Sequence, residues 1–273
     1  MDSEYLNSYN KLKSEIEKFD ISSSPEDERK LLSELNRLSF IAFGFTKIVP
    51  QFERLTINSS LPNNNNETIT EINFLKNPPP ESRTKYGRAN LKNQSVLYAT
   101  FCLPTALNEN NPEIGDLVTI SKWGLKDINF RLMVYPVFDF FNTNNIQLKN
   151  EFNNSIKNYS QNLKEIIIID NCLIASYFSK FVERGKEINY TLSAHIADKI
   201  LNKMYNGKIE AIIYPSVKDR TRSDNIALKP EIFNQKYHLL EVRESRVISK
   251  KEGRIFLKVI KTTTKFNTEY IRW

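Results

Sequence analysis

The chain has 273 residues, 40% of them hydrophobic, so it can bury the core of one large domain or of two small ones. Its formal net charge of +7 favours an anionic partner such as a nucleotide, a nucleic acid or an acidic protein, although lysine and arginine that merely solvate strand surfaces give the same balance. No apolar run approaches the ~20 residues of a membrane-spanning helix, and the polar N-terminus does not resemble a secretory signal, so we expect a cytoplasmic protein without a membrane partner.

Residues 1–50 predict a helical N-terminal extension. Apolar residues recur at helical spacing from Leu6 to Phe19. Ser24, followed by Pro25 and three acidic residues, is typical of the start of a second helix. We interpret this extension as a cap on the main domain; an arm that binds a partner is the alternative.

Residues 51–273 are expected to form the main domain. Its first predicted elements are a short strand at 52–57 that carries Arg54, an asparagine-rich loop at 58–68 and an extended turn at the three prolines 78–80. The loop is strongly polar, so we expect it to be exposed.

The stretch from Arg83 to Glu109 concentrates residue types that suit a phosphorylated sugar. A basic turn around Arg88 leads into an apolar strand that contains Tyr98, and Pro104 opens a short helix that carries Glu109. An arginine in a turn beside an apolar strand is costly unless an anion is near, and a carboxylate can stabilise positive charge that develops on a sugar. This stretch is therefore the candidate site.

The rest of the chain mixes strands and helices without regular βαβ order. The segment from about 150 to 206 is expected to be helical, and its β-branched run at 166–169 fits either a strand or a buried helix. Further strands are predicted at 117–121, 130–141, 209–214, 226–228, 237–246 and 254–263, the last two as an antiparallel pair. This mixture indicates the α+β class.

Each candidate residue also has a purely structural explanation. Arg88 could cap a turn, and Tyr98 could point into the core. Glu109 could pair with a lysine, and Ser216, which follows the strand-ending Pro215, could bond its own backbone.

Several common sites are excluded by spacing. The seven glycines do not cluster, so neither a dinucleotide fingerprint nor a P-loop is present, and no Gly-x-Ser-x-Gly elbow occurs. His195, His238, Cys102 and Cys172 lack the spacing of metal ligands, so we expect no metal site. The two cysteines are expected to be reduced core residues.

Short motifs in order along the chain resemble the RES domain family, which is named for its Arg, Glu and Ser. They are FERL around Arg54, YGRAN at 86–90, VLYAT at 96–100, TALNE at 105–109, and YPSV at 214–217 followed by NIALKP at 225–230. The resemblance covers roughly Phe52 to Arg246, and the helical segment at 150–206 is similar to an elaboration of longer members. FERLTIN fits the family's first, Arg-rich strand only loosely, so Arg83 is the alternative to Arg54 as the first arginine of the site.

The resemblance implies a fold like that of ADP-ribosyltransferase toxins, with split antiparallel sheets around a cleft and flanking helices. It also implies that NAD is a substrate rather than a bound cofactor. The expected activity is NAD degradation by hydrolysis or phosphorolysis, in a toxin that is often paired with an antitoxin protein. ADP-ribosyl transfer to a protein is the alternative activity.

The resemblance also assigns roles to individual residues. Glu109 would stabilise the oxocarbenium-like ribose, while Arg88 and Arg54 would hold the pyrophosphate. Tyr98 would pack on the nicotinamide or the ribose. Ser216 would bond the ribose or nicotinamide end, and Asn225 would orient the loop beneath it.

Two readings outside NAD cleavage remain. A non-catalytic module could use the basic C-terminal strands to bind nucleic acid, with steep salt dependence, but we consider this less consistent with the motifs. The other is a RES-like scaffold that has lost activity.

Overall fold

The computed structural model describes residues 44–141, 143, 145–180, 190–218 and 223–273, and before them only positions 11, 14, 26, 29 and 33. The helical extension predicted at residues 1–50 therefore lies almost wholly outside the described residues. Its last positions are described, and there Phe45–Lys47 form strand β1. Because β1 pairs with a strand of the main domain, the sheet begins before the boundary predicted at residue 51.

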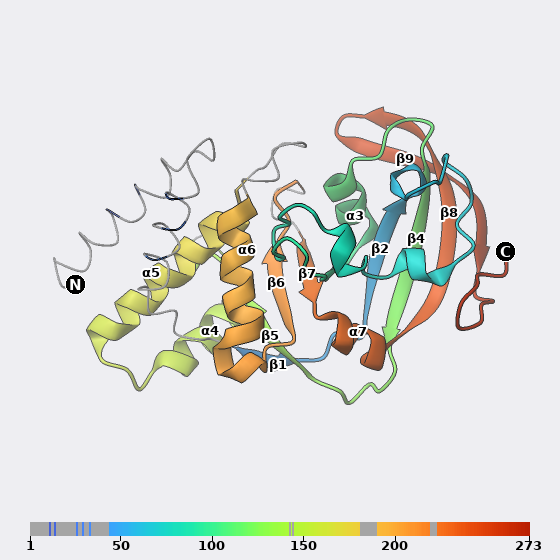
Figure 1. The fold of residues 1–273 in the computed structure, drawn as a ribbon. Coiled ribbons are helices and arrows are strands. Elements are labelled where there is room, and N and C mark those ends of the chain that lie inside the picture. The colour runs from blue at the N-terminus through green and yellow to red at the C-terminus, as the bar shows by residue number, and fades with distance from the viewer. Residues whose placement is uncertain are drawn as a thin grey trace.

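Within the described residues, nine strands form one open, mixed sheet in the order β1-β5-β6-β7-β3-β2-β4-β8-β9 (Figure 1). All neighbouring strands are antiparallel except β5 and β6, which run parallel. The strands are β1 Phe45–Lys47, β2 Gln51–Ile57, β3 Leu97–Thr100, β4 Leu117–Leu125, β5 Leu132–Pro136, β6 Ala211–Pro215, β7 Asp224–Leu228, β8 Tyr237–Lys251 and β9 Arg254–Thr263.

The sheet has two halves that meet at one residue pair. Strands β1, β5, β6, β7 and β3 have 3–5 residues each and form the short-strand half. Strands β2, β4, β8 and β9 have 7–15 residues each and form the long-strand half. At the seam, β2 and β3 pair only through Glu53 and Thr100. Split antiparallel sheets were expected, whereas the described strands form one mixed sheet, because this pairing joins the halves and β5–β6 is parallel.

Five α-helices accompany the sheet in the described part of the chain, so the α+β class is confirmed. Figure 1 shows α4, α5 and α6 gathered beside the short-strand half, with β8 and β9 at the opposite end of the molecule. The helices are α3 Leu103–Asn110, α4 Ile146–Ile156, α5 Gln161–Phe178, α6 Thr191–Asp198, which continues as a π-helical turn at Lys199–Lys203, and α7 Pro230–Lys236. Short 3-10 turns lie at Asn58–Ser60, Ile72–Leu75, Pro80–Ser82 and Met204–Gly207.

The β-branched run at 166–169 lies inside α5. Ser160 caps the helix by accepting a hydrogen bond from the Leu163 backbone N–H. From there, the buried side chains of Ile167, Ile174 and Phe178 recur at helical spacing. A long amphipathic face therefore outweighs the local strand preference of the isoleucines.

Apolar clusters cover both faces of the short-strand half. One contains Leu97 and Ile226 and continues across the seam to Phe52 on β2. The other packs the opposite face against α5 and α6, through residues such as Ile212 and Phe178. A separate cluster holds α3 against the long-strand half. No helix among the described residues is long and apolar enough to cross a membrane.

Candidate functional site

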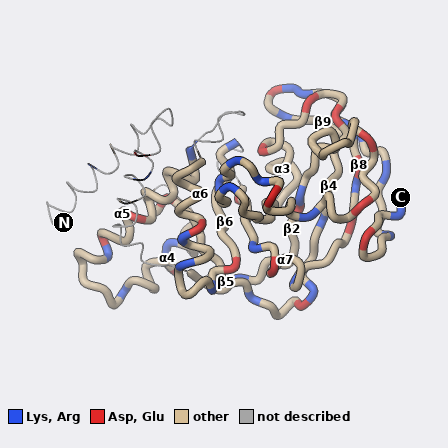
Figure 2. The backbone as a smooth tube through the Cα atoms, viewed as in Figure 1, with Lys and Arg blue, Asp and Glu red and all other residues tan. Residues whose placement is uncertain are grey.

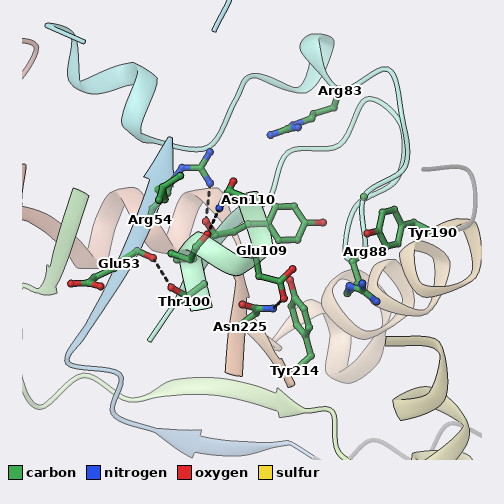
Figure 3. A pocket seen from close by; sticks show the side chains of 15 residues that line it. Glu53, Arg54, Arg83, Arg88, Thr100, Glu109, Asn110, Tyr190, Tyr214 and Asn225 are labelled. Carbon is green, nitrogen blue, oxygen red and sulfur yellow. Dashed lines mark hydrogen bonds between the residues drawn. The ribbon is translucent and has the colours of Figure 1, made fainter. Parts of the chain in front are cut away.

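A cavity of ≈ 310 Å³ lies at the seam between the two halves (Figure 3). This volume is at the lower end of the range for small-molecule sites. Of the six residues proposed from the sequence, five line the cavity, namely Arg54, Arg88, Tyr98, Glu109 and Asn225. The sixth, Ser216, contacts Glu109 directly.

The carboxylate of Glu109 is held by two donors from the short-strand half. Oε1 accepts a hydrogen bond from the Ser216 hydroxyl at 2.6 Å and another from the Asn225 side-chain amide at 2.8 Å. Lys218 donates to the Glu109 backbone carbonyl instead, and no described residue forms an ion pair with the carboxylate. Because Oε2 accepts no hydrogen bond from a described residue, Glu109 keeps capacity to act on a ligand.

Local sequence explains how these groups meet. Pro104 lies in the first turn of α3, and Asn111 ends the helix in the left-handed conformation with φ of 45°, so Glu109 is in the last turn. Pro215 ends β6 and places Ser216, which is fully buried, directly behind it. Asn225 lies on the neighbouring strand β7.

Arg54 and Arg83, which were alternatives in the sequence, line the same cavity. Arg54 donates from NH1 to the Tyr98 carbonyl at 2.7 Å, but its Nε is shielded from solvent without a hydrogen-bond partner among the described residues. Burial and the nearby charge of Arg83 lower the pKa of Arg54 to about 10. Burial likewise lowers the pKa of Arg83. Neither arginine pairs with a carboxylate within the described ranges, so the pair favours an anion between them.

Arg88 is anchored differently. NH1 donates to the carbonyls of Phe178 and of Lys180, the latter at 3.1 Å, just beyond the end of α5. The guanidinium carbon also lies 4.9 Å from the ring centroid of Tyr190. Arg88 therefore lines the cavity, and contacts with the end of α5 and with Tyr190 fix the orientation of its side chain.

Tyr98 has a structural task in addition to lining the cavity. Its hydroxyl accepts a hydrogen bond from the Ala89 backbone N–H at 2.7 Å and donates to Asn90 Oδ1 at 2.8 Å. Burial raises the pKa of Tyr98, so the hydroxyl stays neutral at physiological pH. A Cβ at Gly87 would lie 2.2 Å from Asn90 Oδ1, so this turn requires glycine.

The lining residues that the sequence analysis did not single out include Glu53, Asn110, Tyr190 and Tyr214. Tyr214 belongs to the YPSV motif, and its position just before Pro215 could have indicated it. Glu53 neighbours Arg54 on β2, whereas Tyr190 lies far from every motif and carries no local signal.

Glu113 and the two cysteines do not line the cavity. Glu113 forms a surface ion pair with Lys250 at 3.1 Å, and Cys102 and Cys172 are free and half-buried rather than fully buried. In the described ranges, no group of three or more His, Cys, Asp or Glu side chains has the arrangement of a metal site. The cavity therefore offers one fixed carboxylate, three arginines and several tyrosines.

Comparison with known proteins does not extend this description. No protein-family model matches the sequence, and no curated protein matches it.

Proposed function

We propose that this chain cleaves the bond between nicotinamide and ribose in NAD, and that its fold is a RES-type relative of the ADP-ribosyltransferases. The observation that carries the proposal is the Glu109 carboxylate, which Ser216 and Asn225 hold in a cavity shared with Arg54 and Arg88, neither of which pairs with a carboxylate among the described residues. The RES-like motifs contribute these same residues. The resemblance alone supports the further proposal of a toxin that is controlled by an antitoxin protein.

The fixed carboxylate suits the expected transition state. When the bond to nicotinamide breaks, the leaving group takes the bonding electrons and positive charge develops on C1′ of the ribose. A negative group that is already oriented stabilises this charge without reorganisation. Ser216 and Asn225 supply that orientation for Glu109. Water or inorganic phosphate then forms the new bond to C1′ and loses a proton.

The arginines suit the other end of the substrate. NAD carries a pyrophosphate, and guanidinium groups bind phosphate oxygens with charge-assisted hydrogen bonds. Burial disfavours the charged forms of Arg54 and Arg83, as their lowered pKa values show. A bound pyrophosphate would stabilise these charges and offset that cost. Arg88 contributes from the opposite wall (Figure 3).

The test is nicotinamide release by the full chain, with and without inorganic phosphate. Glu109→Gln keeps the shape of the side chain and removes its charge, so we expect the rate to fall by roughly 10²-fold or more. Glu113→Gln is the matched control, because Glu113 lies on the surface with a 69% exposed side chain. Product analysis separates hydrolysis, which gives ADP-ribose, from phosphorolysis, which gives its 1-phosphate.

Wild-type protein that leaves NAD intact under both conditions would refute the proposal. Transfer of ADP-ribose to a protein would then be measured next. If wild type is active and Glu109→Gln retains the full rate, the assignment of Glu109 is wrong.

A further inference from the structure

The loop that carries Arg88 is docked along helix α6. The contacts begin just before the first residue of the helix and reach its last residue. They consist of a ring contact, a cation–π contact and a hydrogen bond: Tyr86 with His195 at 6.0 Å between centroids, Arg88 with the Tyr190 ring at 4.9 Å, and Gln94 Nε2 donating to Asp198 Oδ1 at 3.3 Å.

The end of α5 also contacts the loop that carries Arg88. The Arg88 NH1 group donates to the Phe178 and Lys180 carbonyls, which belong to the negative end of the helix dipole. The guanidinium carbon lies over the ring of Tyr190, 4.9 Å from its centroid. Hydrogen bonds at NH1 and the ring contact at the guanidinium carbon together restrict the position of the Arg88 guanidinium.

The same loop is held from the sheet side as well. The Tyr98 hydroxyl bonds Ala89 and Asn90, the two residues that follow Arg88. The backbone of Arg88 is therefore fixed by β3, while its side chain is fixed by the helical layer. Its Nε and NH2 groups have no hydrogen-bond partner among the described residues, so they remain as donors for a ligand.

We propose that α5 and α6 form a working part of the cavity and that Tyr190 is the positioning residue that holds the Arg88 guanidinium ready for an anionic group of the substrate. This inference rests on the proposed function for its substrate. Tyr190 lies outside all the RES-like motifs, in the segment that resembles only an elaboration. The structure thus gives this elaboration a role in binding, because an arginine that is oriented in advance loses less freedom when the ligand arrives.

Steady-state kinetics with NAD test the role of Tyr190. Tyr190→Leu removes the ring, and we expect KM to rise roughly tenfold while kcat changes little. Tyr190→Phe keeps the ring and should restore KM. In an Arg88→Ala background, Tyr190→Leu should add nothing, because the residue acts through Arg88. Tyr159→Leu, at an exposed tyrosine, is the matched control.

Additive effects in the double variant, or an unchanged KM in Tyr190→Leu, would overturn the proposal. A parallel loss in kcat and thermal stability would also overturn it, because that pattern indicates general damage to the fold. These outcomes are interpretable once wild type has been shown to cleave NAD.

A measurement without turnover separates this inference from the proposed function. In the full chain labelled with ¹⁵N-arginine, the Nε–Hε signal of Arg88 can be assigned by its absence from Arg88→Lys. We expect it to shift in Tyr190→Leu and to stay in place in Tyr159→Leu, since only the former removes the ring over the guanidinium. If wild type leaves NAD intact but the signal shifts, the proposed function fails while the positioning contact stands. An unshifted signal refutes the positioning contact in either case.

Discussion

The inner strands of the short-strand half are buried on both faces, although its edge strand β1 is not, and the long-strand half ends in an exposed outer strand. Four of the five residues of β6 are buried, as are four of the five of β7. Along β9, Thr263 is the only buried residue, and Figure 2 shows charged residues of both signs on β8 and β9. The inner strands of the short-strand half are therefore enclosed, whereas the long-strand half ends in a solvent-exposed edge strand.

The cavity forms where these unlike regions meet, and side chains replace backbone pairing there. Arg54 on β2 bonds the Tyr98 carbonyl on β3 across the seam. Glu109, on the helix packed against the long-strand half, bonds Ser216 and Asn225 from the other half. The candidate site residues thus also connect the two halves, so substitutions test structure and function together.

The largest expected effect is the loss of stability in alkali, concentrated in the short-strand half. Burial raises the pKa of Tyr98 on β3, Tyr135 on β5, Tyr214 on β6 and Tyr237 at the start of β8. A raised folded pKa means that stability is complete below the unfolded pKa near 10 and falls as the pH rises above it, by about 1.4 kcal/mol per tyrosine at about pH 11. Arg54, whose pKa is lowered, acts in the opposite direction.

From these four tyrosines and Arg54 we therefore expect the free energy of unfolding in urea to fall by about 4 kcal/mol between about pH 9 and about pH 11. Tyr135→Phe should reduce this loss, whereas Tyr159→Phe, at an exposed site, should not. A wild-type stability that is flat over this range would contradict the assigned burial of the tyrosines.

Arg54→Leu should separate binding from stability at the seam. Because the variant loses the Arg54 charge that is proposed to bind the pyrophosphate, NAD binding should weaken by roughly 10²-fold. In the ligand-free protein, Arg54→Leu removes the stabilising hydrogen bond to the Tyr98 carbonyl. It also removes a buried charge whose Nε has no hydrogen-bond partner among the described residues, which is destabilising. Because these two effects oppose each other, the unfolding free energy should change by less than about 1 kcal/mol. Calorimetric titration of NAD in a Glu109→Gln background and thermal unfolding measure the two effects.

The exposed Arg131 offers a matched control, Arg131→Leu, that should alter neither quantity. Equal NAD affinity in Arg54→Leu and wild type would show that the arginine serves only to join β2 to β3. A large fall in the unfolding free energy of ligand-free Arg54→Leu would show that the Arg54 charge is already compensated within the protein.

Local signals in the sequence located many elements of both halves. The strand predicted at 52–57 is β2, the antiparallel pair at 237–246 and 254–263 is β8 and β9, and Pro104 lies in the first turn of α3. The predicted run at 130–141 was too long, because β5 ends at Pro136. Alternation of apolar and polar residues, turn residues and prolines at helix starts each act over a few residues, so the sequence alone reveals them.

The seam and its contacts could not be predicted in this way. Glu53 pairs with Thr100, and Ser216 bonds Glu109 across 107 positions, without any local pattern that specifies the distance. Tyr190 falls within the segment at about 150–206 that the sequence predicts to be helical, and no motif there marks it as a site residue. Residue chemistry indicated Glu109, and the resemblance to a family assigned roles to Arg54 and Ser216. Only the fold places Tyr190 in the same cavity.

A smaller effect is expected at the turn that the short-strand half holds in place. Tyr98→Phe removes the acceptor of the buried Ala89 N–H and the donor to Asn90, so the unfolding free energy should fall by about 2 kcal/mol. Tyr159→Phe makes the same chemical change at an exposed ring and should have no effect. Urea unfolding at neutral pH provides the comparison, and equal stability of Tyr98→Phe and wild type would show that water replaces the hydroxyl.

The smallest effect is expected at the exposed end of the long-strand half. Phe256 on β9 is 44% exposed, so Phe256→Ala should change the unfolding free energy by less than about 0.5 kcal/mol and leave nicotinamide release unchanged. The same substitution at Phe52, which is 1% exposed on β2, should cost about 3–5 kcal/mol because it opens a cavity in the core. Comparable losses at both positions would show that β9 is covered in solution. The long-strand half would then have no free edge, and the contrast between the halves would reduce to strand length.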